Sequence, residues 1–135
     1  MVRDWNSGII EEFRANEGRV GGRFRWVPLL LLHHRGAKTG IERVNPLAYR
    51  KVGDAYVVFA SKGGSPTNPD WYHNLIAHPE AQIEVGTETI DVVARVAKGE
   101  ERRRIWATQT ADMPAFGEYE RRSGREIPVV VLDPR

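Results

Sequence analysis

Hydrophobic and polar positions along the chain divide it into an N-terminal helix, a series of short strands and further helices among and after them. Over residues 5–17, Trp5, Ile9 and Phe13 recur at helical spacing with charged residues between them, which predicts an amphipathic helix. An apolar stripe of this kind packs on a protein core or lies on a membrane, and packing on the core is the more common arrangement. We expect Gly18 to end this helix.

From residue 27 onward the pattern is typical of β-structure. Buried or alternating runs predict six strands, over residues 27–35, 41–50, 55–59, 81–85, 89–97 and 127–132. Further helices are expected at about residues 69–78, 99–110 and 114–122. Short strands that favour antiparallel pairing predict a mainly β fold, a small barrel with helices outside it. The sequence has no G-x-G-x-x-G motif and no regular βαβ alternation, which argues against a dinucleotide-binding Rossmann fold.

The length of 135 residues predicts one domain with a single sizeable core. The absence of cysteine excludes disulfides, a thiolate metal site and a cysteine nucleophile. The N-terminus has no apolar core of a signal peptide, and the longest apolar run, residues 27–32, is too short to span a bilayer. We therefore expect a soluble, cytoplasmic protein. Contact of the N-terminal helix with a membrane is left open as an alternative.

Positive charge is concentrated in the first half of the chain. Residues 1–62 hold 11 Lys and Arg against 6 Asp and Glu, whereas residues 63–135 hold 9 against 12. The first half includes a basic, glycine-containing lip at residues 19–25, so it is suited to an anionic partner. Nucleic acid is not favoured, because the net charge is only +2 and the one basic run is Arg102-Arg103-Arg104.

Two loops carry the clearest chemical signal. Residues 36–43, GAKTGIER, form a basic turn between two strands. Residues 60–68, ASKGGSPTN, follow a strand and lead into a helix, with Asn68 expected as the N-cap and Pro69 at the first helical position. Backbone N–H groups of such a loop, together with a helix N-terminus, can hold a phosphate or a carboxylate. A plain strand–turn–helix connection is the alternative, because glycine-rich loops alone are weak signals.

Hydrolytic and metal-dependent chemistry are not indicated. His33 and His34 are adjacent in a strand and point to opposite faces, so they cannot share a metal. Ser61 and Lys62 are adjacent and cannot form a catalytic dyad. What remains is a pair of basic loops and a set of aromatic residues, Trp71, Tyr72, Phe116 and Tyr119. This combination fits a barrel in which a bound cofactor supplies the chemistry and the protein supplies its placement.

Three segments, residues 36–47, 60–64 and 68–75, resemble the deazaflavin (F420)-dependent nitroreductase and F420H2-dependent quinone reductase family. The likeness extends, in the family's order, over about residues 8–134. It implies a six-stranded antiparallel split β-barrel, FMN-binding-like, with peripheral helices. It also implies hydride transfer from reduced coenzyme F420, a deazaflavin with a phosphate and a polyglutamate tail. The acceptors would be quinones, nitro compounds or activated enones.

The resemblance also implies roles for individual residues. Lys38 and Arg43 would hold the phosphate or the tail carboxylates, and Ser61, Lys62 and Gly63 would meet the ring or its phosphate. The residues expected in the cofactor wall at the start of the helix are Asn68, Pro69, Trp71 and Asn74. A tail of carboxylates would account for the use of 16 Arg against 4 Lys, because the guanidinium fork suits such groups. FMN is the alternative cofactor, and a non-catalytic F420-binding or storage protein is the alternative function.

The hydride acceptor is expected beside Met113, Phe116 and Tyr119. Some nitro-reducing members of the family carry tyrosines where this chain has Met113 and Phe116, so an apolar pocket that favours flat quinones is predicted here. A proton is expected from Ser61, Tyr119 or water. The alternative is that Met113 and Phe116 fill the core, where such residue types are common. No metal is expected, and the sequence does not indicate the oligomeric state.

Overall fold

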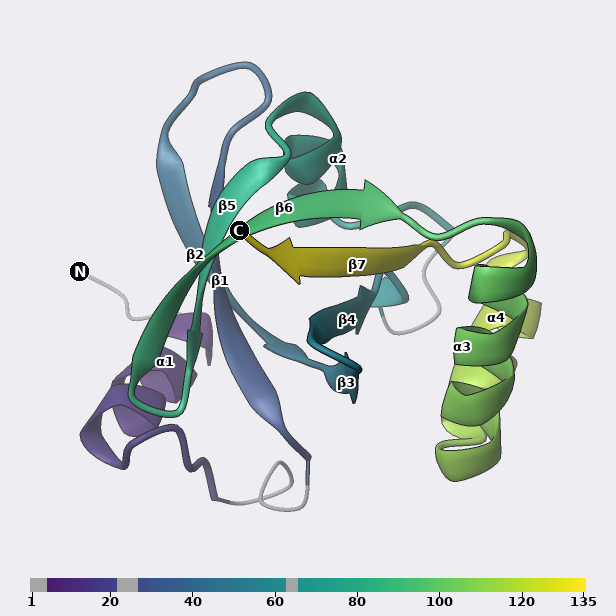
Figure 1. The fold of residues 1–135 in the computed structure, drawn as a ribbon, viewed down its shortest axis with the longest axis horizontal. Helices are drawn as coiled ribbons and strands as arrows, with labels where there is room; N and C mark the ends of the chain where they lie inside the picture. Colours follow the sequence, from purple (N-terminus) through teal and green to yellow (C-terminus); the bar gives the residue numbers. More distant parts are fainter. Residues whose placement is uncertain (1–4, 22–26, 63–65) are drawn as a thin grey trace.

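A computed structural model of the protein describes residues 5–21, 27–62 and 66–135. The elements among these residues are α1 (Trp5–Ala15), β1 (Leu29–Arg35), β2 (Glu42–Ala48), β3 (Arg50–Val52), β4 (Ala55–Phe59), α2 (Asp70–Ala77), β5 (Glu80–Val85), β6 (Glu88–Val96), α3 (Gly99–Asp112), α4 (Ala115–Ser123) and β7 (Val129–Pro134). The strands form one antiparallel sheet in the order β2-β1-β5-β6-β7-β4-β3. The sheet curls into a half-barrel (Figure 1), so the predicted split barrel is confirmed, but one of the helices expected outside it, α2, packs on the inner face of the sheet.

The two edges of the curled sheet belong to one bent stretch of chain. β2 pairs with β1 and β3 pairs with β4, and only Tyr49 separates β2 from β3. The Tyr49 N–H donates to the Pro28 carbonyl at 3.2 Å, outside both ladders. The prediction of six strands is therefore wrong by one, because the expected strand 41–50 changes partner at Tyr49. Pro46 lies in β2, where an edge strand tolerates the missing N–H.

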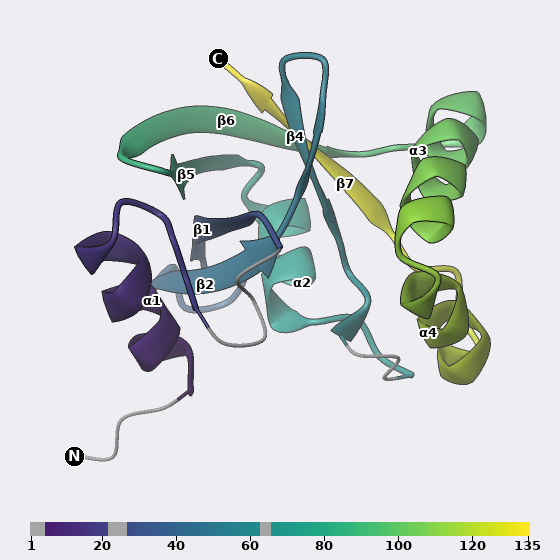
Figure 2. The same cartoon turned by 90° about the horizontal axis from the view of Figure 1, so that it is seen from below.

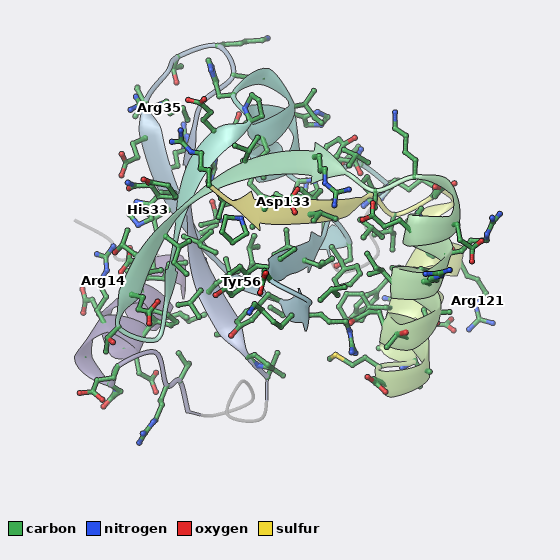
Figure 3. The ribbon with its side chains drawn as sticks, in the orientation of Figure 1. Arg14, His33, Arg35, Tyr56, Arg121 and Asp133 are labelled. Atoms are coloured by element: carbon green, nitrogen blue, oxygen red, sulfur yellow. The ribbon has the colours of Figure 1, made fainter. Side chains whose placement is uncertain are left out.

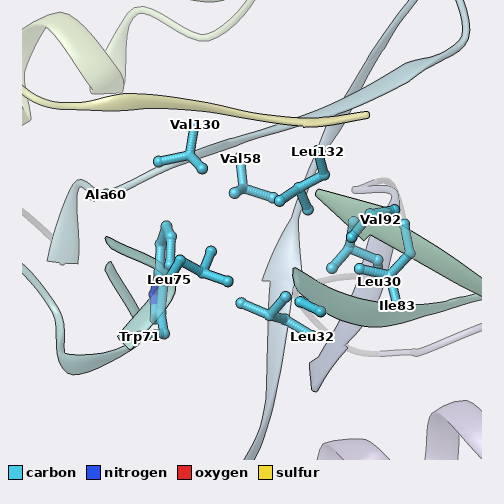
Figure 4. Packing of buried hydrophobic residues seen from close by; sticks show 11 residues of the cluster. Leu30, Leu32, Val58, Ala60, Trp71, Leu75, Ile83, Val92, Val130 and Leu132 are labelled. Carbon is cyan, nitrogen blue, oxygen red and sulfur yellow. The ribbon is translucent and has the colours of Figure 1, made fainter. Parts of the chain in front are cut away.

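Helix α2 fills the inside of the curled sheet (Figures 1 and 2). Its Trp71 and Leu75, 6% and 2% exposed, belong to one apolar cluster with side chains from five strands (Figure 4). The strands supply these side chains by alternation, with Leu30 and Leu32 of β1 on the inner face. Because Trp71 and Leu75 are four residues apart, both lie on the buried face of a helix only eight residues long.

Helix α1 covers the outer face of β1 and β2. Ile9 and Phe13 are buried against Leu29 and Leu31, which confirms that the predicted stripe packs on the core. Contact with a membrane through this stripe is not supported, and the side chain of Trp5 lies outside the described residues. A polar contact also holds the helix, because Arg14 donates to both carboxylate oxygens of Glu84, at 3.1 and 2.7 Å. Figure 3 shows Arg14 beside the sheet.

The Glu84 carboxylate also contacts a side chain of the neighbouring strand β1. Glu84 Oε2 lies 2.5 Å from His33 Nε2, and His33 Nδ1 lies 3.0 Å from Glu42 Oε1. The hydrogen bond from Arg14 first, and that from His33 in addition, lower the pKa of Glu84, and the hydrogen bond from His33 lowers the pKa of Glu42, so each carboxylate stays charged below its usual range. His33 thus lies on the outer face and His34 on the inner one, as the alternation predicts.

Helices α3 and α4 cover the outer face at the other end of the sheet (Figure 2). Phe59 of β4 and Val129 and Val131 of β7 pack there against Ile105 and Phe116. Among the described residues, no helix is long and apolar enough to cross a membrane. No group of three potential metal-ligating side chains occurs in this part of the chain either.

Replacement of Leu75 by Ala should destabilise the fold by about 2–5 kcal/mol. The side chain is buried inside the half-barrel, so its removal loses apolar contacts and leaves a cavity. Ile76→Ala is the matched control on the same helix. Ile76 is 57% exposed, so its loss should change the free energy of unfolding by less than about 0.5 kcal/mol. Urea unfolding of the three proteins measures both values, and equal effects at the two positions would contradict the packing described here.

Candidate functional site

The two basic loops predicted to bind an anion both adjoin α2. The loop of residues 36–40 connects β1 to β2, and the loop of residues 60–68 connects β4 to α2. A hydrogen bond from the Ala37 N–H to Asn74 Oδ1, 2.9 Å long, attaches the first loop to the helix. The first loop is itself a tight turn, in which the Gly40 N–H donates to the Gly36 carbonyl at 2.9 Å. Gly40 has a φ of 70°, a conformation that favours glycine.

A buried polar network lies beneath the first loop. The Asn74 amide donates to His34 Nδ1 at 3.0 Å, which leaves the proton of a neutral imidazole on Nε2. His34 Nε2 then donates to Asn45 Oδ1 at 2.7 Å. His34 and Asn74 are 3% and 7% exposed, so the middle of this chain of bonds is shielded from water. Burial first, and the nearby charge of Arg43 in addition, lower the pKa of His34 and keep it neutral.

Strand register places Arg43 on the face of the sheet that carries α2. Arg43 pairs with His34 across the β1–β2 ladder, and residues directly opposite each other share a face. The side chains of Arg43 and Lys38 are exposed. Among the described residues, no carboxylate lies within ion-pair distance of either cation. The site therefore presents two positive charges that no described carboxylate neutralises.

In the second loop, the predicted residues Ser61 and Lys62 lie directly after β4. The Ala60 N–H continues the pairing of β4 by donating to the Pro128 carbonyl at 3.0 Å. Lys62 has a φ of 48°, the left-handed region that side chains rarely adopt, and its Nζ lies 3.4 Å from Thr67 Oγ1. Gly63 lies outside the described residues, as do Arg23 and Arg25 of the basic lip.

The start of α2 differs from the prediction by one residue. Pro69, not Asn68, occupies the N-cap position, and no side chain of the described residues caps the helix. Asn68 instead accepts a hydrogen bond from Arg125 Nη1 through its Oδ1, 2.6 Å away. Proline fits here because its extended φ and ψ lead the chain into the helix without an N–H to satisfy.

The predicted cofactor-wall residues are mainly buried. Pro69 and Asn74 are shielded from solvent, and Trp71 lies in the inner core. These three side chains therefore support the position of α2 and of the first loop, and Asn74 does so through the network described above. Their direct contact with a cofactor stays a prediction.

The predicted acceptor residues fall into different surroundings. Phe116 is 9% exposed, with ring centroids 5.5 Å from Phe59 and 6.4 Å from Trp106. Tyr119 packs on Phe116 at 5.4 Å. Phe116 therefore fills the core, which was the alternative interpretation of this residue, and Tyr119 lies next to it.

Met113, in contrast, borders a cavity of about 330 Å³. Its lining residues come from the segment before β1, the bend between β2 and β3, the end of β4 and the C-terminal end of α3, and they are Val27, Pro28, Ala48, Tyr49, Arg50, Lys51, Phe59, Gln109 and Met113. Arg50 holds the two walls together. Its Nε donates to Gln109 Oε1 at 2.9 Å and its Nη2 to Asp112 Oδ2 at 2.6 Å.

Three functional contributors were not predicted from the sequence. His34 carried a usable signal, since it is a polar residue on the apolar face of a strand and so needs buried partners. Arg50 and Arg125 carried none. Their partners lie far away in the chain and, for Arg125, are mostly backbone carbonyls, which have no signature in a sequence.

Comparison with known proteins places these features in a family. The family model described as F420H(2)-dependent quinone reductase matches residues 7–134. An F420H(2)-dependent quinone reductase of Mycobacterium tuberculosis strain H37Rv is 41% identical over 127 residues, which are 91% of this chain and 85% of that protein. A second such protein of the same strain is 39% identical over 118 residues, 87% of this chain and 99% of its own length.

Solved structures agree with the fold. A structure described as an F420-H2 dependent reductase has a TM-score of 0.71 at 36% identity and covers 78% of this chain and 94% of its own. A structure described as a domain-swapped dimer has a TM-score of 0.74 at 34% identity, with 92% and 91% covered. The haem storage protein of Vibrio cholerae shares the fold alone, with a TM-score of 0.60 at 18% identity, 93% of this chain and 87% of that one being covered. The fold alone therefore does not identify the ligand, which has to be inferred from the residues of the site.

The buried network predicts a pH dependence of stability. The pKa of His34 is lowered in the folded protein, so below pH 6.5 the unfolded chain takes up a proton that the folded chain does not. Stability should fall as the pH drops below 6.5, with a slope approaching about 1.4 kcal/mol per pH unit, until the lowered pKa is reached. His34→Gln should have a flatter slope between pH 6.5 and about 5.5, above the range in which carboxyl groups such as those of Glu42 and Glu84 titrate in the unfolded chain. Urea unfolding across this range measures it.

His78→Gln is the control for that experiment, because His78 is exposed and outside the network. It should leave the slope of the wild type unchanged. Equal slopes for the wild type and His34→Gln would show that folding does not lower the pKa of His34.

Proposed function

The chain belongs to the F420H(2)-dependent quinone reductase family, and on that premise we propose how its own residues hold coenzyme F420 and which acceptors they favour. Members of the family are oxidoreductases that use this coenzyme, and this protein is one of them. The observation that carries the proposal is the pair of exposed cations, Lys38 and Arg43, on segments held rigidly against α2.

The residues fit a ligand with phosphate and carboxylate groups. Lys38 and Arg43 offer charge-assisted donors that no carboxylate of the described residues engages. The Ala37–Asn74 bond holds the Lys38 loop in one place, so binding need not order it first. The neutral state of His34 matters here, because a protonated imidazole could no longer accept the Asn74 hydrogen bond that completes the network.

The second loop supplies the remaining contacts of this proposal. Ser61 and Lys62, just after β4, would donate to the deazaflavin or its phosphate, with Gly63 beside them. Asn68, Pro69, Trp71 and Asn74 would shape the wall behind. A hydroxyl and an ammonium group at the end of a rigid strand can hold polar edges of a planar ring in a fixed orientation.

Reduced F420, when bound, supplies the hydride. The protein's part is to align the donor and acceptor carbons and to exclude competing orientations, which can account for much of the rate of such a transfer. A proton must follow the hydride. Ser61 or Tyr119 would hold it at a hydroxyl oxygen, and water is the third source.

The acceptor would lie along the cavity that Met113 and Phe59 border. These side chains offer a polarisable apolar surface without a proton donor, which suits flat quinones whose oxygens take their protons from water. Since Phe116 is buried in the core, its effect on selectivity passes through Phe59 and Tyr119, the two rings on which it packs.

We expect F420 to bind more tightly than FMN, with an affinity that falls as salt rises, because Lys38 and Arg43 are exposed to counterions. Lys38→Ala should weaken F420 binding by about 10- to 100-fold, the equivalent of about 1.5–3 kcal/mol for one charge-assisted hydrogen bond. Fluorescence titration with F420 and with FMN at several salt concentrations measures these affinities. Lys98→Ala, which removes an exposed lysine before α3, should match the wild type. A preference for FMN, or binding that ignores salt, would refute the proposal.

Selectivity should respond to Met113. Met113→Tyr adds a hydroxyl at the rim of the cavity and should shift the kcat/KM ratio of a nitroimidazole to a quinone upward by about tenfold, as one added hydrogen bond of about 1.4 kcal/mol would. Met113→Leu conserves the volume without adding a donor, so it should keep the wild-type ratio. Steady-state rates with both acceptors measure the ratio, and a wild type that prefers the nitroimidazole would contradict the apolar pocket.

A further inference from the structure

One side chain from the end of α4 joins the two flanks of the second loop. Arg125 Nη1 donates to Asn68 Oδ1 at 2.6 Å, and Nη2 donates to the carbonyls of Ala60, Ser61 and Thr67 at 3.0, 3.1 and 3.1 Å. Two of these acceptors precede residues 63–65 and two follow them. A single guanidinium therefore fixes the distance between the point where the loop leaves the sheet and the point where it enters α2.

The guanidinium is itself held from a rigid turn. α4 ends at Gly124, whose φ of 68° turns the chain sharply. The Arg125 N–H donates to Ser123 Oγ at 3.2 Å, and the Ser123 hydroxyl contacts the Arg125 carbonyl at 3.2 Å. Ser123 is 8% exposed. Partial burial lowers the pKa of Arg125, which agrees with a guanidinium that is partly removed from water where it donates to oxygens of the loop.

The strained residue of the loop lies next to this contact. Lys62 has a left-handed φ of 48°, which is unfavourable for a residue with a side chain. Its preceding carbonyl, that of Ser61, is one of the oxygens that Arg125 holds. A conformation of this kind persists only where its surroundings enforce it, and such residues cluster at ligand sites.

We propose that Arg125 is a positioning residue for coenzyme F420. It holds the flanks of the loop, residues 60–62 and 66–68, in the conformation that presents Ser61 and Lys62 to the bound cofactor. The inference rests on the proposed function of the loop but adds a residue outside it. Because Arg125 directly follows the helix that carries Tyr119, it also joins the helix beside the acceptor to the loop that contacts the cofactor.

The first test uses the protein without cofactor. Hydrogen exchange should be about tenfold faster at the amides of residues 61, 62, 67 and 68 in Arg125→Ala than in the wild type, as expected when hydrogen bonds that close a loop are lost. The amides of residues 36–40, held by Asn74, should not change. Arg121→Ala is the matched control. It removes an arginine from α4, the helix that precedes Arg125, but one that points into solvent and pairs with Glu118 (Figure 3).

The second test is the dissociation constant for F420, measured by fluorescence. Arg125→Ala should bind about tenfold more weakly or worse, and Arg125→Lys should recover only part of the affinity, because a single ammonium group lacks the second nitrogen that donates to Asn68. Asn68→Ala removes only one of the contacts that Arg125 makes with the described residues, and it should give a smaller loss. Arg121→Ala should bind as the wild type does.

These outcomes separate positioning from general stability. If Arg125→Ala lowers the thermal midpoint but leaves both the exchange at the loop flanks and the F420 affinity of the folded protein unchanged, the proposal is overturned. Should Arg125→Ala not fold, Arg125→Lys and Asn68→Ala decide it by the same two measurements. If the wild type does not bind F420, the proposed function fails, and hydrogen exchange still reports whether Arg125 holds the loop.

Discussion

The position of α2 inside the curled sheet is the constraint on which the rest of the structure depends. Trp71 and Leu75 fix the helix in the apolar interior, and Asn74, on the same short helix, bonds to the loop that carries Lys38. A shift of α2 would therefore disturb the core and the anion-binding loop together. Because His34 and Asn74 are buried, a lost partner in this network would leave polar atoms unsatisfied, which is costly away from water.

The two faces of the sheet divide the work of the protein. The inner face, with α2, sets the position of the two loops proposed to bind the cofactor, whereas the outer face under α3 and α4 forms a separate apolar cluster around Phe59 and Phe116. The bend at Tyr49 brings these regions together, because Arg50 beside it bonds to Gln109 and Asp112 at the end of α3. The cavity lies at this junction, bordered by residues of the sheet and of the helix.

Much of the fold could be predicted from the sequence, because strand alternation and the stripe of α1 are local patterns. The break at Tyr49 could not, since it depends on which strand lies alongside, and β3 finds its partner β4 only once the sheet has curled. In the site, the basic loops were identified by composition and resemblance. The burial of Trp71 and Phe116, by contrast, depends on tertiary packing, and aromatic side chains at the same spacing could equally line a pocket. Asn68 was misassigned as an N-cap because the competing guanidinium of Arg125 is 57 residues away.

The separation of the apolar clusters has a consequence for how such a protein can diverge. Substitutions around Met113 and Phe116 alter packing between α3, α4 and the outer face, while the network of Asn74 and His34 lies on the opposite side of the sheet. Sites that share no partners tend to vary independently in their effects on stability. Selection can therefore change the range of acceptors through drift in the helical pair while the cofactor loops stay under separate constraint. The exception is Arg125, because a single substitution there would affect both the loop after β4 and the chain that follows α4.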